Sequence, residues 1–390
     1  VNKQGLIEVV EGDRPRIDYT DTSDGALLLE PQRTNLVTYS EDFSQSYWTK
    51  NLSTITSNNA ISPNGTLNAS KLTSSNNGQN SRIEFFPTVS DNAIYTSSIF
   101  VKKGSLNFIS LNLRDKAGVT RVAYFDIDNG TVSSTINSPN DAKIENYGNG
   151  WFRVSVSVNV GIGGTSVRAQ YVLASADGSV DTDLNTFLYI YGAQLEQSSY
   201  ASSYIPTQGS TVTRVADTAS GSGNSEVFND SEGVLFANIA ALTQDNDDTV
   251  ELCINNGTTN NRLSISFQTA TNALRVVARV SGVNQVNRTK TLSDITLFNK
   301  IAFKYKQNDY SVFVNGFEIL TDTIGTTFPT STLNTFDFDR ADGGTPFYGK
   351  TKQIGYYNTI LTDLELETLT SYRTWLSMVN ELNLNVIYNG

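Results

Sequence analysis

The chain of 390 residues contains no histidine and only one cysteine, Cys253. The missing imidazole excludes Ser-His-Asp and Cys-His catalytic arrangements, and it excludes histidine metal sites. A single cysteine cannot form an intrachain disulfide. Without a histidine to activate it, Cys253 is interpreted as a small buried hydrophobic residue. The composition therefore argues against most enzymes that depend on imidazole, zinc or iron.

Basic residues and long apolar runs are also scarce. Only 28 Lys and Arg stand against 39 Asp and Glu, which gives a net charge of -11. Nucleic acid is not expected as a partner, because phosphate binding needs clustered basic side chains. No run of about 18 apolar residues occurs, so membrane insertion is not expected. The chain starts with Val1 rather than Met, which suggests a processed form or a piece of a longer protein.

The residues that are abundant favour strands joined by polar turns. Hydrophobic residues make up 38% of the chain and charged residues 17%, while there are 28 Gly, 18 Tyr and 19 Phe. Alternation is clearest where Phe152, Val154, Val156 and Val158 share one face. Similar segments recur along the chain, and turn signals such as Asp126–Gly130 separate them. We predict an all-β fold of two antiparallel β-sandwiches.

One helix is expected near the C-terminus. Thr362 and Glu365 have the spacing of a capping box. Leu366, Leu369 and Leu376 then recur at helical steps, so one face should pack inward. The tail from Glu381 to Gly390 alternates weakly and is expected to add a strand to this chain or to a neighbour.

The stretch Tyr189–Asp217 lies at the border of the two strand-rich halves. Simple alternation places Tyr189, Tyr191, Ala193 and Leu195 on one face, where they would seal the first core. Gln194 and Glu196 fall on the other face. The stretch is interpreted as a structural clasp between the halves.

Several segments of the first half resemble known families. Asn35–Phe43 with Trp48, and Gly150–Val156, resemble strands of carbohydrate-binding-module-like jelly rolls. Other segments resemble bacteriophage tail-fibre and head-fibre proteins: Leu28–Leu36, Gly192–Glu196, Ser203–Thr207 and Thr211–Asp217. Residues 233 to 372 resemble the concanavalin A-like (laminin G-like) sandwich, through Lys300–Tyr305, Val314–Gly316, Gly349–Lys350, Ile354–Asn358 and Leu361–Glu365.

The turn residues and composition, together with these resemblances, predict how the chain is divided into domains. Residues 1–34 form an N-terminal strand meander that continues a longer chain, and residues 35–206 form a jelly roll. Residues 207–225 form a connector. Residues 226–390 form a concanavalin A-like sandwich with the C-terminal helix and tail.

The resemblance to fibre proteins also implies a function. It indicates a non-enzymatic structural or appendage protein of a bacteriophage virion, a tail or head fibre that attaches to a glycan on the host surface. The implied partners are other virion proteins and a host glycan, with the chain as a homo-oligomer, trimeric by analogy with virion fibres. Two alternatives stay open: a glycan-degrading depolymerase of the particle, and a structural spacer or assembly protein without a ligand.

Candidate site residues follow from the same reasoning. No strand shows the paired acids that glycosidases need, so no catalytic residue is expected. Tyr200, Tyr204, Phe347, Tyr348, Tyr356 and Tyr357 are the candidates for glycan contact, whereas Trp48 and Trp151 suit either core packing or sugar stacking.

No organic cofactor is expected, and the remaining question is calcium. The jelly-roll calcium site departs from its pattern at Ser44 and at Ala193-Gln194. The loop with Asp245, Asp247 and Asp248 could instead supply oxygen ligands to a structural Ca²⁺, or it is a solvated acidic turn.

Overall fold

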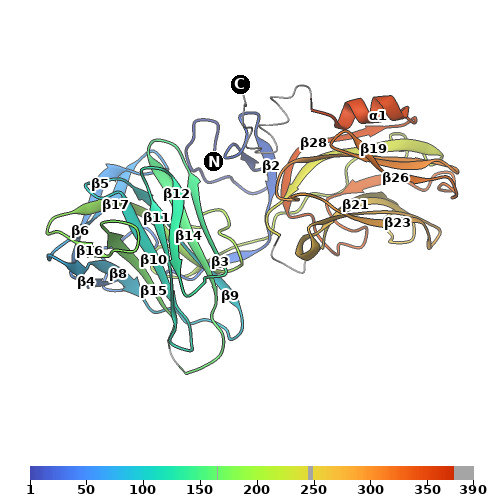
Figure 1. Cartoon of the computed structure of the whole chain (residues 1–390). Helices are drawn as coiled ribbons and strands as arrows, with labels where there is room; N and C mark the ends of the chain where they lie inside the picture. Colours follow the sequence, from blue (N-terminus) through green and yellow to red (C-terminus); the bar gives the residue numbers. More distant parts are fainter. Residues whose placement is uncertain (165, 245–248, 373–390) are drawn as a thin grey trace, which may run out of the picture. The chain divides into compact units, whose positions relative to one another are not determined.

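A computed structural model describes residues 1–164, 166–244 and 249–372 (Figure 1). These residues form antiparallel sheets, one short 3₁₀ turn (Thr269–Thr271) and one helix, α1 (Asp363–Thr370). The predicted fold class, two antiparallel β-sandwiches with one C-terminal helix, is confirmed. In the part of the chain that the structure covers, no helix has the length and hydropathy needed to cross a membrane.

The chain divides into two compact units. The N-terminal residues are shared between them, because the chain passes from one to the other several times before Gln32. The first unit comprises Val1–Arg14, Asp18–Ser23 and Gln32–Ala216, and the second comprises Pro15–Ile17, Asp24–Pro31 and the chain from Asp217 onwards.

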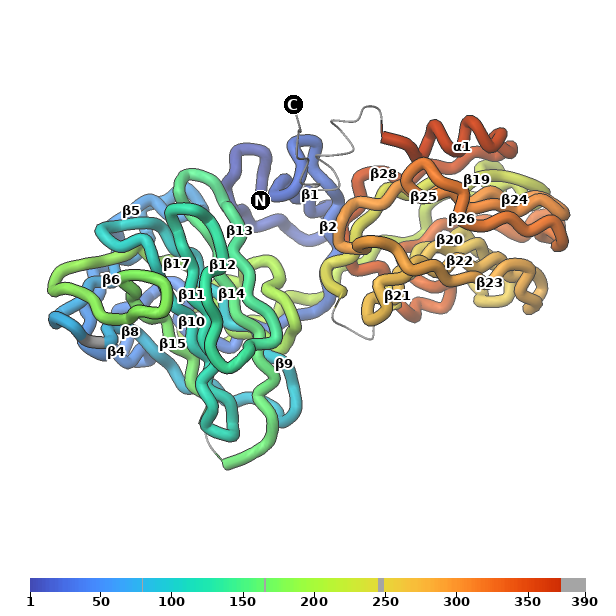
Figure 2. Tube along the Cα trace, in the orientation of Figure 1, coloured from blue at the N-terminus to red at the C-terminus, as the bar shows by residue number. Residues whose placement is uncertain are grey.

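The first unit is a sandwich of two six-stranded sheets (Figure 2). Sheet one contains, in spatial order, β12 (Thr131–Ile136), β11 (Thr120–Asp126), β10 (Phe108–Arg114), β15 (Arg168–Ala174), β8 (Arg82–Phe85) and β4 (Thr49–Asn51). Sheet two contains β13 (Asp141–Asn146), β14 (Trp151–Asn159), β9 (Ile94–Lys102), β17 (Phe187–Gln197), β6 (Leu67–Ser74) and β5 (Ser53–Ile61). Two small pairs accompany them: β16 (Asp181–Thr182) with β7 (Gln79–Asn80), and β18 (Val212–Arg214) with β3 (Arg33–Asn35).

The core of the first unit follows from strand alternation. Val154, Val156 and Val158 of β14 point into it as predicted. Trp48 is also in this core, and its indole nitrogen donates to the carbonyl of Tyr39 at 3.0 Å. Trp151 lies on the opposite face of sheet two, where it is 1% exposed and donates to the carbonyl of Ile61. Both tryptophans are therefore packing residues, and neither ring is free to stack on a sugar.

The second unit is a sandwich of a seven-stranded and a five-stranded sheet. The seven-stranded sheet contains β1 (Ile17–Asp18), β2 (Ala26–Leu29), β28 (Gly349–Tyr357), β19 (Glu232–Ala241), β24 (Asn299–Lys306), β25 (Tyr310–Val314) and β26 (Phe317–Asp322). The five-stranded sheet contains β23 (Val283–Thr291), β22 (Ala273–Val280), β21 (Arg262–Gln268), β20 (Thr249–Asn255) and β27 (Thr335–Asp337).

Local sequence explains several features of this unit. Asn315 and Gly316 both have positive φ, 50° and 87°, so they form the tight turn that joins β25 to β26.

Cys253 is fully buried, and burial raises the pKa of its thiol, which fits its interpretation as a core residue.

The helix begins where the sequence predicts. The Thr362 hydroxyl accepts from the amide of Glu365, and the Glu365 carboxylate accepts from the amide of Thr362 at 2.8 Å. Leu366 packs on Phe236 and Phe313 on the outer face of the seven-stranded sheet. The predicted continuation through Leu376, and the predicted strand from Glu381 to Gly390, lie outside the described residues.

The N-terminal meander is only partly as predicted. The strands β1 and β2 form within the predicted meander, but the apolar run Gly5–Val10 forms no strand. The Asn2 carboxamide oxygen instead accepts from the amide of Leu6, and Gly5 adopts a φ of 77°, so this segment turns rather than extends. β2 pairs with β28 in the second unit.

The alternation predicted for Tyr189–Leu195 is wrong at its centre. Gly192 has a φ of 59° and lies in a β-bulge between Tyr191 and Gln194. The bulge reverses the alternation, so Tyr189 and Tyr191 face away from the core while Ala193 and Leu195 face into it.

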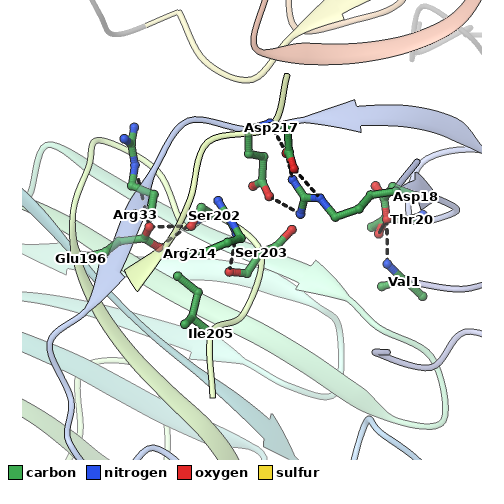
Figure 3. A network of polar contacts seen from close by, with 12 residues as sticks. Val1, Asp18, Thr20, Arg33, Glu196, Ser202, Ser203, Ile205, Arg214 and Asp217 are labelled. Carbon is green, nitrogen blue, oxygen red and sulfur yellow. Dashed lines mark hydrogen bonds and ion pairs between the residues drawn. The ribbon is translucent and has the colours of Figure 1, made fainter. Parts of the chain in front are cut away.

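After β17 the chain folds back over the outer face of sheet two. We call residues 198–207 the strap. Thr96 and Ser157, on strands β9 and β14, donate hydroxyl hydrogen bonds to the carbonyls of Ser198 and Ser199. Ser202 donates to Glu196, and Arg33 lies beside the same carboxylate, with 3.9 Å between Nε and Oε2 (Figure 3). The strap therefore closes this face with polar contacts.

In the second unit the N-terminal segment is held by an ion-pair cluster. Arg16 pairs with Asp217 and donates to Glu30 at 2.8 Å, and the amides of Glu30 and Asp217 each donate to the other residue (Figure 3). This cluster fixes the end of β2 beside the start of the second unit's main segment.

Candidate functional site

The outer face of sheet one carries an unusual concentration of hydrogen-bonding side chains. The inward positions of its strands, such as Ile83, Tyr171 and Leu111, fill the core. The alternate positions point outward. We call the following outward side chains the polar row: Asn51 on β4, Arg82 and Glu84 on β8, Arg168 and Gln170 on β15, and Ser110, Asn112 and Arg114 on β10.

The strand register brings these side chains together. Gln170 lies directly opposite Glu84 on one side and Asn112 on the other. Asn51 lies opposite Arg82. Directly opposed side chains on one face are within reach of each other, so four separate strands contribute to one continuous row.

Glu84 is the centre of the row. It is 5% exposed, and its carboxylate accepts from Asn51 Nδ2 at 2.6 Å, from Gln170 Nε2 at 2.6 Å and from Arg82 Nε at 3.0 Å. Asn112 continues the chain of contacts by donating to Gln170 Oε1 at 3.5 Å. These bonds hold the planar amide and guanidinium groups in fixed orientations before any ligand arrives.

The pKa of Glu84 fits this setting. Burial alone would raise it, but hydrogen bonds from Gln170 and Arg82, together with the charge of Arg82, lower it overall. Glu84 is therefore ionised at neutral pH. It can accept hydrogen bonds but is poorly suited to donate a proton as a general acid.

An apolar cluster adjoins the row on the same face. Val122 of β11 lies directly opposite Asn112, and Tyr124 lies opposite Ser110. Both pack with Ala174 and with the partly buried Phe108 and Val180. Val122, Tyr124 and Ala174 are themselves buried, so this cluster packs one end of the face beside the oriented polar groups.

The predicted aromatic candidates in the first unit lie elsewhere. The Tyr204 ring packs against Phe100 and Tyr191 in the strap contact, and its hydroxyl contacts Ser40 at 2.8 Å and Glu41 at 3.1 Å. Tyr200 is half-buried beneath the guanidinium of Arg33. Both side chains make packing and polar contacts at the strap, and neither is part of the polar row.

The other four candidates belong to the second unit. Phe347 is 1% exposed and lies in the core. Tyr348 and Tyr356 are half-buried, and only Tyr357 is open at the surface, with 37% exposed. Tyr356 lines an apolar cavity of about 200 Å³ with Phe228 and Phe336. The structure thus does not gather the six predicted aromatic residues into one site.

The calcium hypothesis is not tested by the structure. Asp245, Asp247 and Asp248 lie outside the described residues. Within the described ranges, no group of three or more His, Cys, Asp or Glu side chains is arranged to hold a metal ion. Structural calcium at the Asp245 loop remains a prediction.

The polar row was missed from the sequence, although a signal for it exists. Arg82 and Glu84, Arg168 and Gln170, and Asn112 and Arg114 are each two residues apart, with an apolar residue between them. That spacing places each pair on one face of a strand. The pattern becomes visible as a site only when the order of the strands is known.

Comparisons with known proteins leave the family open. A search of family models finds no match, and a search of curated proteins finds none. Solved structures give weak likenesses. A heptameric SAP-like pentraxin from Limulus polyphemus has a TM-score of 0.31 at 13% identity, covering 39% of this chain and 74% of that one.

Two further structures give similar values. Laminin alpha1 domains LG4-5 from mouse have a TM-score of 0.27 at 12% identity, covering 72% of this chain and 86% of that one. A leech intramolecular trans-sialidase has a TM-score of 0.33 at 20% identity, covering 41% of this chain and 27% of that one. At these values the likenesses carry no argument about function.

Proposed function

We propose that this chain is a non-enzymatic carbohydrate-binding protein and that the polar row is its glycan-contacting face. The observation that carries the proposal is the Asn51–Glu84–Gln170–Asn112 network, which orients planar hydrogen-bonding groups from four strands on one face. Sugar hydroxyls both donate and accept hydrogen bonds, so they suit a row of amides, guanidinium groups and one carboxylate. The exposed ring of Phe86, which directly follows β8, would meet the apolar face of a sugar ring.

A binding role is favoured over catalysis for chemical reasons. Glycoside hydrolysis needs two carboxyl groups placed on either side of the bond to be cleaved. The polar row has one carboxylate, Glu84, and its lowered pKa keeps that group ionised. The chain contains no histidine that could act as an acid or base instead.

The finer hypothesis is that the chain is an appendage of a bacteriophage particle, located on the virion surface, where glycan binding attaches the particle to its host. This hypothesis rests on the sequence resemblance to fibre proteins alone. Weak binding at each site would then be strengthened by several copies in one particle, since linked sites act with a high effective concentration. Other virion proteins and a homo-oligomer are the partners that this hypothesis requires.

The proposal is tested by screening the full chain against a glycan array. We expect binding to at least one class of glycan. Asn51→Ala and Gln170→Ala should each abolish it, while Lys143→Ala, an exposed position on sheet two, should leave it intact. Asn51 is half-buried at a sheet edge, so its variant should fold even if the Gln170 variant does not. Absence of glycan binding, or binding that survives both substitutions, would contradict the proposal.

Two further assays separate the alternatives. Incubation with host capsule or exopolysaccharide, followed by an assay for new reducing ends or unsaturated uronates, would reveal a depolymerase. A spacer or assembly protein would bind no glycan and would still be required for particles to assemble. Immunogold labelling of purified particles would test the location on the virion surface.

A further inference from the structure

Two arginines of the polar row lie directly opposite each other on neighbouring strands, although their like charges repel. The register of β10 and β15 places Arg114 directly opposite Arg168. Both side chains point to the outer face, next to Asn112 and Gln170. Like charges directly opposite each other destabilise an antiparallel pair.

No carboxylate compensates this pair fully. Arg168 Nε lies 3.9 Å from Glu84 Oε2, but it forms no hydrogen bond. Glu84 is already engaged by Asn51, Gln170 and Arg82. In the part of the chain that the structure describes, Arg114 forms no ion pair, and its Nε donates to the carbonyl of Gly118 at 3.1 Å. The row thus carries three arginines against one glutamate, in a chain whose net charge is -11.

The surroundings of the pair are accessible and include an aromatic residue. The Arg168 side chain is 28% exposed, and Arg114 is half-buried. Phe86 follows β8 directly and is 55% exposed. Because Phe85 pairs with Ala169, the next step of the same register brings Phe86 level with Arg168. A sugar ring on Phe86 would place its substituents near both guanidinium groups.

We infer that the glycan bound at the polar row is acidic, and that Arg114 and Arg168 together bind a sugar carboxylate. This inference rests on the proposed function of the same face. Guanidinium groups bind carboxylates with two parallel hydrogen bonds, and the anion relieves the repulsion between the arginines. Arg114 and Arg168 therefore carry an excess of positive charge, which the carboxylate of a uronate residue neutralises.

The test uses matched glycans that differ only in charge. Oligogalacturonate and oligomannuronate are compared with their methyl esters by isothermal titration calorimetry on the full chain. We expect an acid form to bind at least about tenfold more tightly than its ester, and this preference should weaken as salt is added. Arg114→Gln and Arg168→Gln should each remove the preference for the acid form over its ester. Arg288→Gln, an exposed arginine of the second unit, should have no effect.

The outcomes separate the two proposals. Equal binding of acid and ester, or a preference that survives both substitutions, would overturn the inference but leave the proposed function intact. Binding of dextran sulfate without binding of either uronate would overturn the assignment of a carboxylate. If no glycan of any charge binds, both proposals fail. Circular dichroism of each variant confirms that a loss of binding is not a loss of folding.

Discussion

Ser202 donates two hydrogen bonds to the carboxylate of Glu196, one from its backbone amide at 2.9 Å and one from its hydroxyl at 2.6 Å. The Ser202 carbonyl in turn accepts from Arg153 Nη1 at 2.5 Å. Glu196 and Arg153 are both almost completely buried, at 0% and 2% exposed. One residue of the strap thus links the buried carboxylate to the buried guanidinium, and it adds to the contacts that Thr96 and Ser157 make with the strap.

Replacing Ser202 by alanine should therefore destabilise the first unit. The substitution removes one donor from a buried carboxylate, and such a loss costs about 1–3 kcal/mol. The free energy of unfolding, measured in urea, should fall by this amount. Ser166→Ala, at an exposed loop position, serves as the control and should change little. Equal effects of the two substitutions would show that the hydroxyl of Ser202 contributes nothing specific.

The same carboxylate should give the first unit a characteristic pH dependence. Burial raises the pKa of Glu196 above its ordinary value of 4.5, despite hydrogen bonds and the charge of Arg153 that lower it. At pH values between the ordinary pKa, which applies to the unfolded state, and the raised pKa of the folded state, the folded state holds a proton that the unfolded state has released. Stability from this group therefore falls as the pH rises through that window.

Glu196→Gln removes the titrating group and so isolates its contribution. The free energy of unfolding of the variant minus that of the wild type should increase as the pH rises above 4.5, the ordinary pKa of the carboxyl group. Urea unfolding at several pH values measures this difference. A difference that is constant, or that decreases with pH, would mean that the folded-state pKa is not raised.

The bulge at Gly192 should be intolerant of a side chain. A Cβ there would meet the Phe100 ring at 2.9 Å and the Tyr204 ring at 3.1 Å, in addition to the strain of a φ of 59°. Gly178 has a φ of 72°, but a Cβ added there would meet nothing within 4 Å, so this position isolates the backbone strain. We expect Gly178→Ala to cost about 1 kcal/mol and Gly192→Ala about 3 kcal/mol in unfolding free energy. Similar losses at both positions would argue that the rings move aside freely.

The capping box of α1 offers a test in the second unit. Thr362→Ala removes the hydroxyl that accepts from the Glu365 amide and should cost about 1 kcal/mol. Amide hydrogen exchange should become faster in α1, because the first turn frays more often. Thr359→Ala, at an exposed position before the helix, is the control. Unchanged exchange in α1 would show that packing of Leu366 alone holds the helix.

Much of the strand pattern could be predicted from the sequence because the buried faces alternate cleanly. The strand predicted from the alternation of Phe152, Val154, Val156 and Val158 is β14. The edge strand β23 was not predicted, since Val286 is its only buried residue and, apart from the exposed Val283, the rest of it is polar. A strand with so little apolar surface is specified by its partner β22 rather than by its own sequence.

Other features depend on relationships that one strand's sequence does not contain. Counting alternate residues across Gly192 gave the wrong face for Tyr191, because a bulge inserts an extra residue. The polar row needs the spatial order of β4, β8, β15 and β10, which come from distant parts of the chain. From the sequence, aromatic residues were predicted to contact the glycan. A ring such as Phe347 instead packs in the hydrophobic core.

The pairing of β2 with β28 has a consequence for how the molecule is made and dissected. β2 leaves the ribosome long before β28, because most of the strands lie between them in the sequence. The second unit therefore cannot complete its larger sheet until β28 has been synthesised, and until then β2 has no β28 to pair with. A fragment cut at Asp217 would leave one side of β28 unpaired and would lack Leu28 and Leu29 from its sheet. Such an open edge favours aggregation, so a usable second unit has to carry its N-terminal strand with it.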